Sequence, residues 1–140
     1  MTLLLDTSVV LKWFHEEGES EVGPARALLA AQRSGTEQVV VLDLCAYELG
    51  NVLLRSLRLP AAVVVEQLSL LRSLCGPLLH PRPSWFDAAA LLGETHALSY
   101  YDASWAAAAQ ALRCPLVSAD SRLLRAGLAV TATEAAAGLA

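Results

Sequence analysis

Four acidic residues stand where a carboxylate normally destabilises a fold, beside the end of a predicted buried strand or on an apolar helix face: Asp6, Glu48, Asp102 and Asp120. Asp6 follows the apolar run at residues 3–5, and Asp120 follows the run at residues 115–119. The carboxyl ends of parallel strands meet at one edge of an open α/β sheet, where active sites form. We therefore expect these carboxylates to form a site for a divalent metal ion.

Helix capping is the simpler explanation for three of these acids. A side-chain oxygen at the N-cap satisfies a free backbone N–H and stabilises a helix by about 1 kcal/mol. Asp6, Asp102 and Asp120 each stand at the start of a predicted helix, so each taken alone fits this role. Capping does not, however, predict that the acids converge at one edge of a sheet. Helix N-termini also favour the charged carboxylate, which keeps it ready for a cation.

Glu48 is harder to explain by structure alone. On a predicted helix, its neighbours three and four residues away are mainly apolar: Leu44, Cys45, Asn51 and Val52. An unpaired charge on such a face is costly, and buried unpaired acids are rare. A salt bridge to an arginine is the structural alternative. We favour metal coordination, because it compensates a buried carboxylate well.

The ligand types indicate which metal and which chemistry. Carboxylate oxygens alone select Mg²⁺ or Mn²⁺ over zinc, which more often binds His or Cys. The three histidines and three cysteines are scattered along the chain, and no pair has the spacing of metal ligands. Bound Mg²⁺ can activate a water, neutralise a scissile phosphate and stabilise the departing oxygen. Hydrolysis of a phosphodiester therefore fits this set of residues.

Length and composition bound the class of protein. The 140 residues are 55% apolar, which is enough for one domain with its own core, so we expect a single domain spanning residues 1–140. Charged residues interrupt every apolar stretch well before the roughly 18 residues that a membrane span requires. The N-terminus has no basic region and too short an apolar run for a signal peptide. We therefore expect a cytoplasmic protein without a membrane segment.

The charge balance argues against extended nucleic-acid binding. The chain has 14 acidic and 10 basic residues, a net charge of −4, so the four candidate site residues account for the whole excess. Lys12 is the single lysine. Proteins that bind nucleic acid over a large surface usually carry a basic patch. A small enzyme with few phosphate contacts remains compatible, because bound metal supplies the missing positive charge.

Apolar periodicity predicts alternating strands and helices. We expect strands at residues 2–6, 39–42, 78–80, 116–118 and 128–130, and helices at residues 7–14, 20–33, 43–57, 60–75, 85–97, 103–112 and 120–125. Thr7 or Ser8, Asp43 and Ser84 are the expected N-caps of three of these helices. The alternation implies an α/β fold with a mostly parallel sheet between two layers of helices.

Four motifs in this order and spacing resemble those of PIN-domain ribonucleases: Asp6-Thr7-Ser8 with Lys12-Trp13, Glu48 with Asn51 and Leu53, Tyr100-Tyr101-Asp102-Ala103, and Ser118-Ala119-Asp120 with Leu123. The resemblance spans nearly the whole chain and is closest to the single-domain VapC-type toxins of VapBC toxin-antitoxin systems. It implies a Rossmann-like fold, Mg²⁺ or Mn²⁺ as cofactor, RNA as substrate, a homodimer and a cognate antitoxin.

Carried over residue by residue, the resemblance makes Asp6 and Asp102 the most direct metal ligands. Glu48 and Asp120 complete the quartet, and Ser8 matches a supporting hydroxyl. The sequence departs from the family at Leu42, where proline is common, and at Ser118, where threonine is common. Neither departure touches the acids. The expected function is therefore a metal-dependent endoribonuclease, the toxin of a type II toxin-antitoxin pair.

Two other classes of protein are alternatives. A phosphoacceptor switch domain also gathers carboxylates and Mg²⁺ at the sheet edge, but it needs a nearby lysine, and Lys12 lies on the first helix. A non-catalytic binding module would keep the acids as structure and would bind no divalent metal.

Several residues near the motifs have both a structural and a functional interpretation. We expect Tyr100 and Tyr101 to pack in the core, with stacking on an RNA base as the alternative. Lys12 either contacts phosphate or lies at a solvated helix end. Arg122 and Arg125 either line an RNA groove or lie on an exposed helix face.

Overall fold

A parallel sheet forms the centre of the computed structural model, which describes residues 1–139. Within these residues it has three strands in the order β2-β1-β3, namely Gln38–Val40, Thr2–Leu5 and Leu116–Val117. Leu3 pairs with Val39 on one side, and Leu5 pairs with Val117 on the other. The expected α/β class and parallel strand direction are confirmed.

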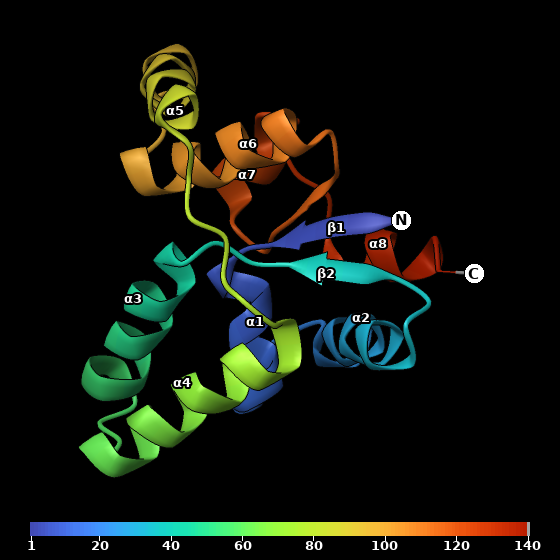
Figure 1. The fold of residues 1–140 in the computed structure, drawn as a ribbon, viewed down its shortest axis with the longest axis vertical. Coiled ribbons are helices and arrows are strands. Elements are labelled where there is room, and N and C mark those ends of the chain that lie inside the picture. The colour runs from blue at the N-terminus through green and yellow to red at the C-terminus, as the bar shows by residue number, and fades with distance from the viewer. Residues whose placement is uncertain (140) are drawn as a thin grey trace.

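Helices cover the two faces of the sheet (Figure 1). In this view α5, α6 and α7 lie above the strands, and α1 to α4 lie below them. The helices are α1 Thr7–Phe14, α2 Val22–Ser34, α3 Leu44–Asn51, α4 Ala61–Cys75, α5 Pro83–His96, α6 Tyr100–Leu112, α7 Ser121–Arg125 and α8 Ala132–Ala137. A π-helical turn, η1 Val52–Ser56, continues α3.

The central strand is apolar on both faces because both faces are covered. Leu3, Leu4 and Leu5 are all buried, as expected of a parallel strand between two helical layers. The ladder extends one residue beyond β1, since the backbone N–H of Asp6 donates to the carbonyl of Val117 at 3.1 Å. This bond places Asp6 at the carboxyl edge of the sheet, beside the end of β3.

Helix α6 packs closely because its buried side chains are small. Ala103 and Ala107 contact Ala89 of α5, and other alanines of α6 face the main core. The exception is Trp105, the largest fully buried side chain of the molecule's described part. Its burial within an alanine helix fixes the rotation of α6 about its axis, and therefore the direction in which Asp102 points.

The predicted element boundaries are partly wrong. The strands expected at residues 78–80 and 128–130 are reduced to single parallel bridges, Leu42 with Leu79 and Val117 with Val130. The helix expected at 43–57 changes to π geometry at Val52. The short helix α8 was not expected. Pairing between strands decides where a strand forms, and a local pattern along the chain does not contain it.

Two predicted helix caps are also wrong, and a third, Asp43, is at the predicted N-cap position without a capping hydrogen bond. Asp6, and neither Thr7 nor Ser8, caps α1, because its side chain accepts the N–H of Ser8. Asp43 precedes α3 but makes no capping bond, and its carboxylate instead binds the His80 ring at 2.8 Å. Helix α5 begins at Pro83, before the expected cap Ser84, since proline suits the first helical position.

Lys12 is neither solvated nor free to contact phosphate. Its side chain is only 3% exposed, and its ammonium donates to Glu19 at 3.0 Å and to the carbonyl of Ser20 at 2.7 Å. It therefore ties the end of α1 to the turn before α2. Both interpretations made from the sequence are wrong here.

The two tyrosines are more exposed than the sequence predicted. The two arginines are exposed, which agrees with one of their two interpretations. Tyr100 and Tyr101 are exposed rather than packed in the core, and Arg122 and Arg125 are exposed on α7.

Of the helices in residues 1–139, none combines the length and apolarity required to cross a membrane.

Candidate active site

The four acids line one cavity of about 310 Å³ at the carboxyl edge of the sheet. Asp6 follows β1, Glu48 lies on α3, Asp102 lies in the first turn of α6, and Asp120 lies between β3 and α7. Thr7, Ser8, Leu11, Val52 and Trp105 complete the lining. The structure thus brings together side chains that are up to about a hundred positions apart in the chain, which capping alone does not require.

Both carboxylate oxygens of Asp6 are engaged. One accepts hydrogen bonds from the backbone N–H and the hydroxyl of Ser8, at 3.1 and 2.5 Å, and the other accepts the hydroxyl of Ser118 at 2.5 Å. Asp6 is only 4% exposed. Burial raises its pKa from 3.8 to about 6, the negative charge of Glu48 adds to this, and the serine hydrogen bonds oppose it.

The same two serines position Asp120. The hydroxyl of Ser8 accepts the backbone N–H of Ala119 at 2.8 Å, and that of Ser118 accepts the backbone N–H of Asp120 at 2.9 Å. Asp120 then caps α7, with its carboxylate accepting backbone N–H groups at 2.9 and 3.2 Å. Asp120 therefore both caps a helix and lines the cavity, as does Asp6.

Asp102 lines the cavity without serving as a cap. Ser99 caps α6, because its hydroxyl accepts the backbone N–H of Asp102 at 3.1 Å. Burial raises the pKa of the Asp102 carboxyl, and the charge of Asp120 raises it further, whereas Ser99 and Arg122 lower it. The capping explanation is therefore wrong for Asp102, whose carboxylate is available to the cavity.

Glu48 is held by two uncharged donors. Its Oε1 accepts the hydroxyl of Thr7 at 2.8 Å and the indole N–H of Trp105 at 3.0 Å. Among residues 1–139 no arginine or lysine forms an ion pair with it. The salt bridge considered as the structural alternative is thus absent from the described part of the chain.

The chemistry of the lining suits a hard divalent cation. Its polar side chains offer carboxylate and hydroxyl oxygens, and neither histidine nor cysteine contributes to it. After burial, the charge of Glu48 helps to raise the pKa of Asp6, and the charge of Asp120 helps to raise that of Asp102. A cation would relieve this repulsion. In residues 1–139, however, no three or more His, Cys, Asp or Glu side chains are arranged to hold a metal ion.

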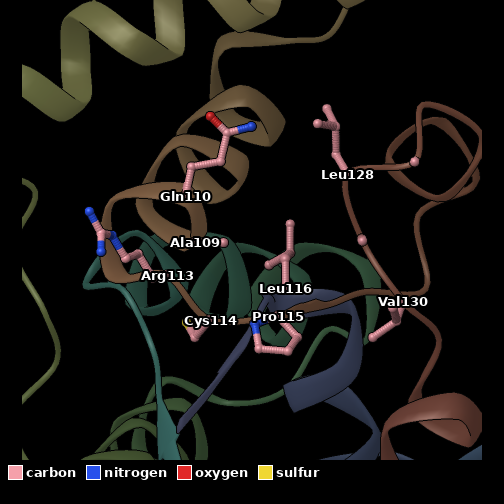
Figure 2. Close-up of a pocket in the computed structure, with 10 residues that line it drawn as sticks. Ala109, Gln110, Arg113, Cys114, Pro115, Leu116, Leu128 and Val130 are labelled. Carbon is pink, nitrogen blue, oxygen red and sulfur yellow. The ribbon is translucent and has the colours of Figure 1, made fainter.

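A larger groove of about 450 Å³ lies elsewhere and carries no acid (Figure 2). Gln110 and Arg113 project from the end of α6 on one side, and Leu116 and Leu128 lie across from them. The groove shares no residue with the acidic cavity. Its size does not make it the candidate site, because no carboxylate that could bind a hard cation lines it.

The sequence did not identify three residues as part of the site: Ser118, Thr7 and Trp105. Ser118 could have been identified, because a serine at the end of a buried apolar strand needs a hydrogen-bond partner for its hydroxyl, and Ser118 is indeed fully buried. Trp105 lies one helical turn after Asp102 and so on the same face. A tryptophan in an apolar helix is nevertheless normally assigned to the core, which hides its polar contact.

Comparisons with known proteins agree with this geometry. The PIN domain family model matches residues 3–128. A search among curated protein sequences finds no match. Among solved structures, PAE2754 from Pyrobaculum aerophilum is similar at 20% identity and a TM-score of 0.67, covering 98% of this chain and 96% of its own.

Two further solved structures are similar over nearly their full length. VapBC-1 from nontypeable Haemophilus influenzae has 16% identity and a TM-score of 0.69, covering 95% of this chain and 99% of its own. FitAcB from Neisseria gonorrhoeae has 21% identity and a TM-score of 0.65, covering 92% and 96%. At these identities the likeness shows the fold. Because the family model matches most of the sequence, the chain belongs to the PIN-domain family.

Proposed function

We propose that this protein is a Mg²⁺- or Mn²⁺-dependent endoribonuclease that hydrolyses phosphodiester bonds in RNA. The observation that carries the proposal is the convergence of four carboxylates, from four separate elements, on one cavity. Capping accounts for the placement of Asp6 and Asp120 but not for that of Glu48 and Asp102. Membership of the PIN-domain family supports the same chemistry.

In this mechanism Asp6 and Asp102 would hold the divalent ion, and Glu48 and Asp120 would complete the acidic pocket. The bound ion supplies Lewis-acid chemistry, polarising water and the scissile phosphate. Ser8 acts indirectly, because it fixes one oxygen of Asp6 and at the same time the backbone beside Asp120. Because no three His, Cys, Asp or Glu side chains in residues 1–139 are arranged to hold a metal ion, the acids must approach one another to share one.

The two alternative classes are less well supported. A phosphoacceptor domain requires a lysine beside its acids, but the single lysine, Lys12, is buried and paired with Glu19. In a non-catalytic module, a buried aspartate at position 6 would have no benefit to offset its cost, because burial disfavours the ionised carboxylate. Metal binding distinguishes this second alternative from the nuclease.

We further propose that the nuclease is the toxin of a type II toxin-antitoxin pair, acting in the cytoplasm and inhibited by a cognate antitoxin. The support is the family resemblance in sequence, together with the full-length likeness in fold to VapBC-1 and FitAcB. An RNA-cleaving toxin requires an inhibitor while its host cell grows. A growth arrest on expression, relieved by a neighbouring gene product, is the corresponding observation.

A homodimer is the proposed assembly. Exposed apolar side chains gather where α3, α5 and α6 begin, and Tyr47, Phe86, Tyr100 and Tyr101 line a groove of about 250 Å³ there. This aromatic groove shares no residue with the acidic cavity. A second copy covering it would bury the rings and leave the acids accessible.

The first prediction is that the protein cleaves single-stranded or structured RNA only with Mg²⁺ or Mn²⁺. Cleavage should disappear when a chelator removes the ion and return when the ion is added in excess, because the carboxylates alone repel the phosphate. Gel analysis of a labelled RNA measures this. Cleavage that persists in excess EDTA would contradict the proposal.

Asp102→Asn should abolish cleavage, by at least about 100-fold, since even partners outside the ligand set contribute about 10- to 100-fold at metal sites. The metal-free variant should be as stable as wild type or more so, because one repelling charge is gone. The rise in melting temperature with Mg²⁺ should shrink. The exposed Asp87 on the neighbouring α5 provides the control Asp87→Asn.

That control should cut RNA at the wild-type rate and show the full Mg²⁺ shift. Asp102 is not the cap of α6, so its substitution removes no capping bond. If Asp102→Asn matches Asp87→Asn in both measurements, then Asp102 is not a ligand.

The raised pKa of Asp6 predicts how metal-free stability changes with pH. The Asp6 carboxyl ionises near pH 3.8 in the unfolded chain and near pH 6 in the folded one. The proton that the folded state holds more tightly therefore stabilises the fold fully below pH 3.8, and this stabilisation is lost as the pH rises through about 6. The loss should be on the order of 3 kcal/mol. Asp6→Asn cannot ionise and should not show it.

Urea unfolding in EDTA between about pH 4 and pH 7 measures this difference. Other carboxyl groups titrate in both proteins, so the curve of wild type minus Asp6→Asn isolates Asp6 and its coupling to Glu48. Parallel curves would show that Asp6 ionises normally in the folded state.

The dimer prediction concerns the aromatic groove. Wild type should sediment as a dimer at micromolar concentration, and Tyr47→Asp should shift it toward monomer by placing a charge in the interface. Leu54→Asp is the control, since Leu54 is also exposed but lies on η1, outside the groove. A wild-type monomer, or equal effects of the two substitutions, would count against this interface.

A further inference from the structure

Two buried donors converge on the same oxygen of Glu48. Thr7 begins α1, Trp105 lies on α6 and Glu48 lies on α3, so three helices meet at this carboxylate. The hydroxyl of Thr7 and the indole N–H of Trp105 donate to Oε1 at 2.8 and 3.0 Å. Thr7 is 9% exposed and Trp105 is 1% exposed. The two donor side chains are therefore themselves largely shielded from water.

The indole of Trp105 is a stringent positioning group. Its N–H is a donor only, and Glu48 is its hydrogen-bond partner. A buried donor without a partner costs about 1–3 kcal/mol, so the bond to Glu48 is strongly favoured. The ring is itself fixed by the surrounding core, as the largest fully buried side chain in residues 1–139. The orientation of the Glu48 carboxylate is thereby set by the packing of α6.

The second oxygen of Glu48 is left for the cavity. Oε2 accepts no hydrogen bond from any of residues 1–139, whereas Oε1 already accepts two. Glu48 and Trp105 both line the acidic cavity. With Oε1 engaged, this glutamate has one oxygen rather than two to offer to a cation or to a water that the cation binds.

We propose that Trp105 is a positioning residue of the active site, which together with Thr7 holds Oε1 of Glu48 and so presents Oε2 to a divalent ion or its water. The inference rests on the proposed metal-dependent function and deepens it. Partners that orient metal ligands usually control affinity for the ion as much as the reaction itself. Trp105 should therefore affect metal binding through Glu48 without touching the metal.

The molecule contains a matched control for this tryptophan. The indole N–H of Trp13 also donates a partly buried hydrogen bond, to the carbonyl of Ala25 at 2.9 Å, but this bond joins α1 to α2 away from the cavity. Trp105→Phe and Trp13→Phe each remove one indole donor and the same ring volume. Both substitutions should lower folding stability, more so for the fully buried Trp105, but only Trp105→Phe should affect the site.

Mn²⁺ binding by the metal-free protein, measured by titration calorimetry, provides the main test. Trp105→Phe should raise the half-saturating Mn²⁺ concentration by about 10-fold, and Trp13→Phe should leave it unchanged. At the second donor, Thr7→Val should weaken binding, and Thr7→Ser, which keeps the hydroxyl, should restore it. Equal Mn²⁺ affinity for the two tryptophan variants would overturn the proposal.

A spectroscopic measurement tests the hydrogen bond itself without metal. The indole N–H resonance of Trp105 is identified by its disappearance in Trp105→Phe. In metal-free Glu48→Gln it should move, because an amide replaces the carboxylate acceptor, while the Trp13 resonance stays in place. An unmoved Trp105 resonance would show that the bond to Glu48 does not form. If Trp105→Phe fails to fold, the comparison of Thr7→Val with Thr7→Ser decides.

The outcomes separate this inference from the proposed function. Wild type that binds Mn²⁺ but never cuts RNA would overturn the nuclease and leave the positioning role supported by the Mn²⁺ titration. Wild type that cuts RNA, with unchanged Mn²⁺ affinity in Trp105→Phe, would overturn the positioning role alone. Wild type that binds no Mn²⁺ would overturn both.

Discussion

The burial of Asp6 is the constraint on which the rest of the site depends. A carboxylate that is only 4% exposed must have partners for its oxygens, and both are supplied by serine hydroxyls from Ser8 and Ser118. These hydroxyls in turn accept the backbone N–H groups of the loop that carries Asp120. The compensation of one buried charge therefore fixes the position of a second acid, more than a hundred residues away.

The sheet and α6 extend this arrangement to the other two acids. Parallel pairing of β1 and β3 brings their carboxyl ends together, and so Asp6 beside the loop after β3. The alanine side chains of α6 allow the helix to pack closely, and the buried Trp105 sets the rotation of α6 about its axis. This rotation directs Asp102 into the cavity and the indole N–H of Trp105 toward Glu48. Burial raises the pKa values of Asp6 and Asp102, with a further contribution from the charges of Glu48 and Asp120, and a cation would offset both effects.

The sequence predicted those features that depend on local pattern and strand direction. A buried apolar run followed by an acid identified the surroundings of Asp6 and Asp120, and an apolar helix face identified Glu48. It did not predict features that depend on long-range partners. Lys12 is buried because Glu19 and Ser20 fold back over it, and Trp105 donates to Glu48 because two distant helices meet. Neither partner follows from spacing along the chain.

The central claim is that the four acids bind one or more divalent ions. The most direct measurement is a crystal structure of the protein grown with Mn²⁺, with anomalous differences collected at the manganese edge. The account predicts an anomalous peak in the acidic cavity within coordination distance, about 2.2 Å, of carboxylate oxygens of Asp6 and Asp102. No peak in the cavity at saturating Mn²⁺, or a peak coordinated only by residues elsewhere, would contradict it.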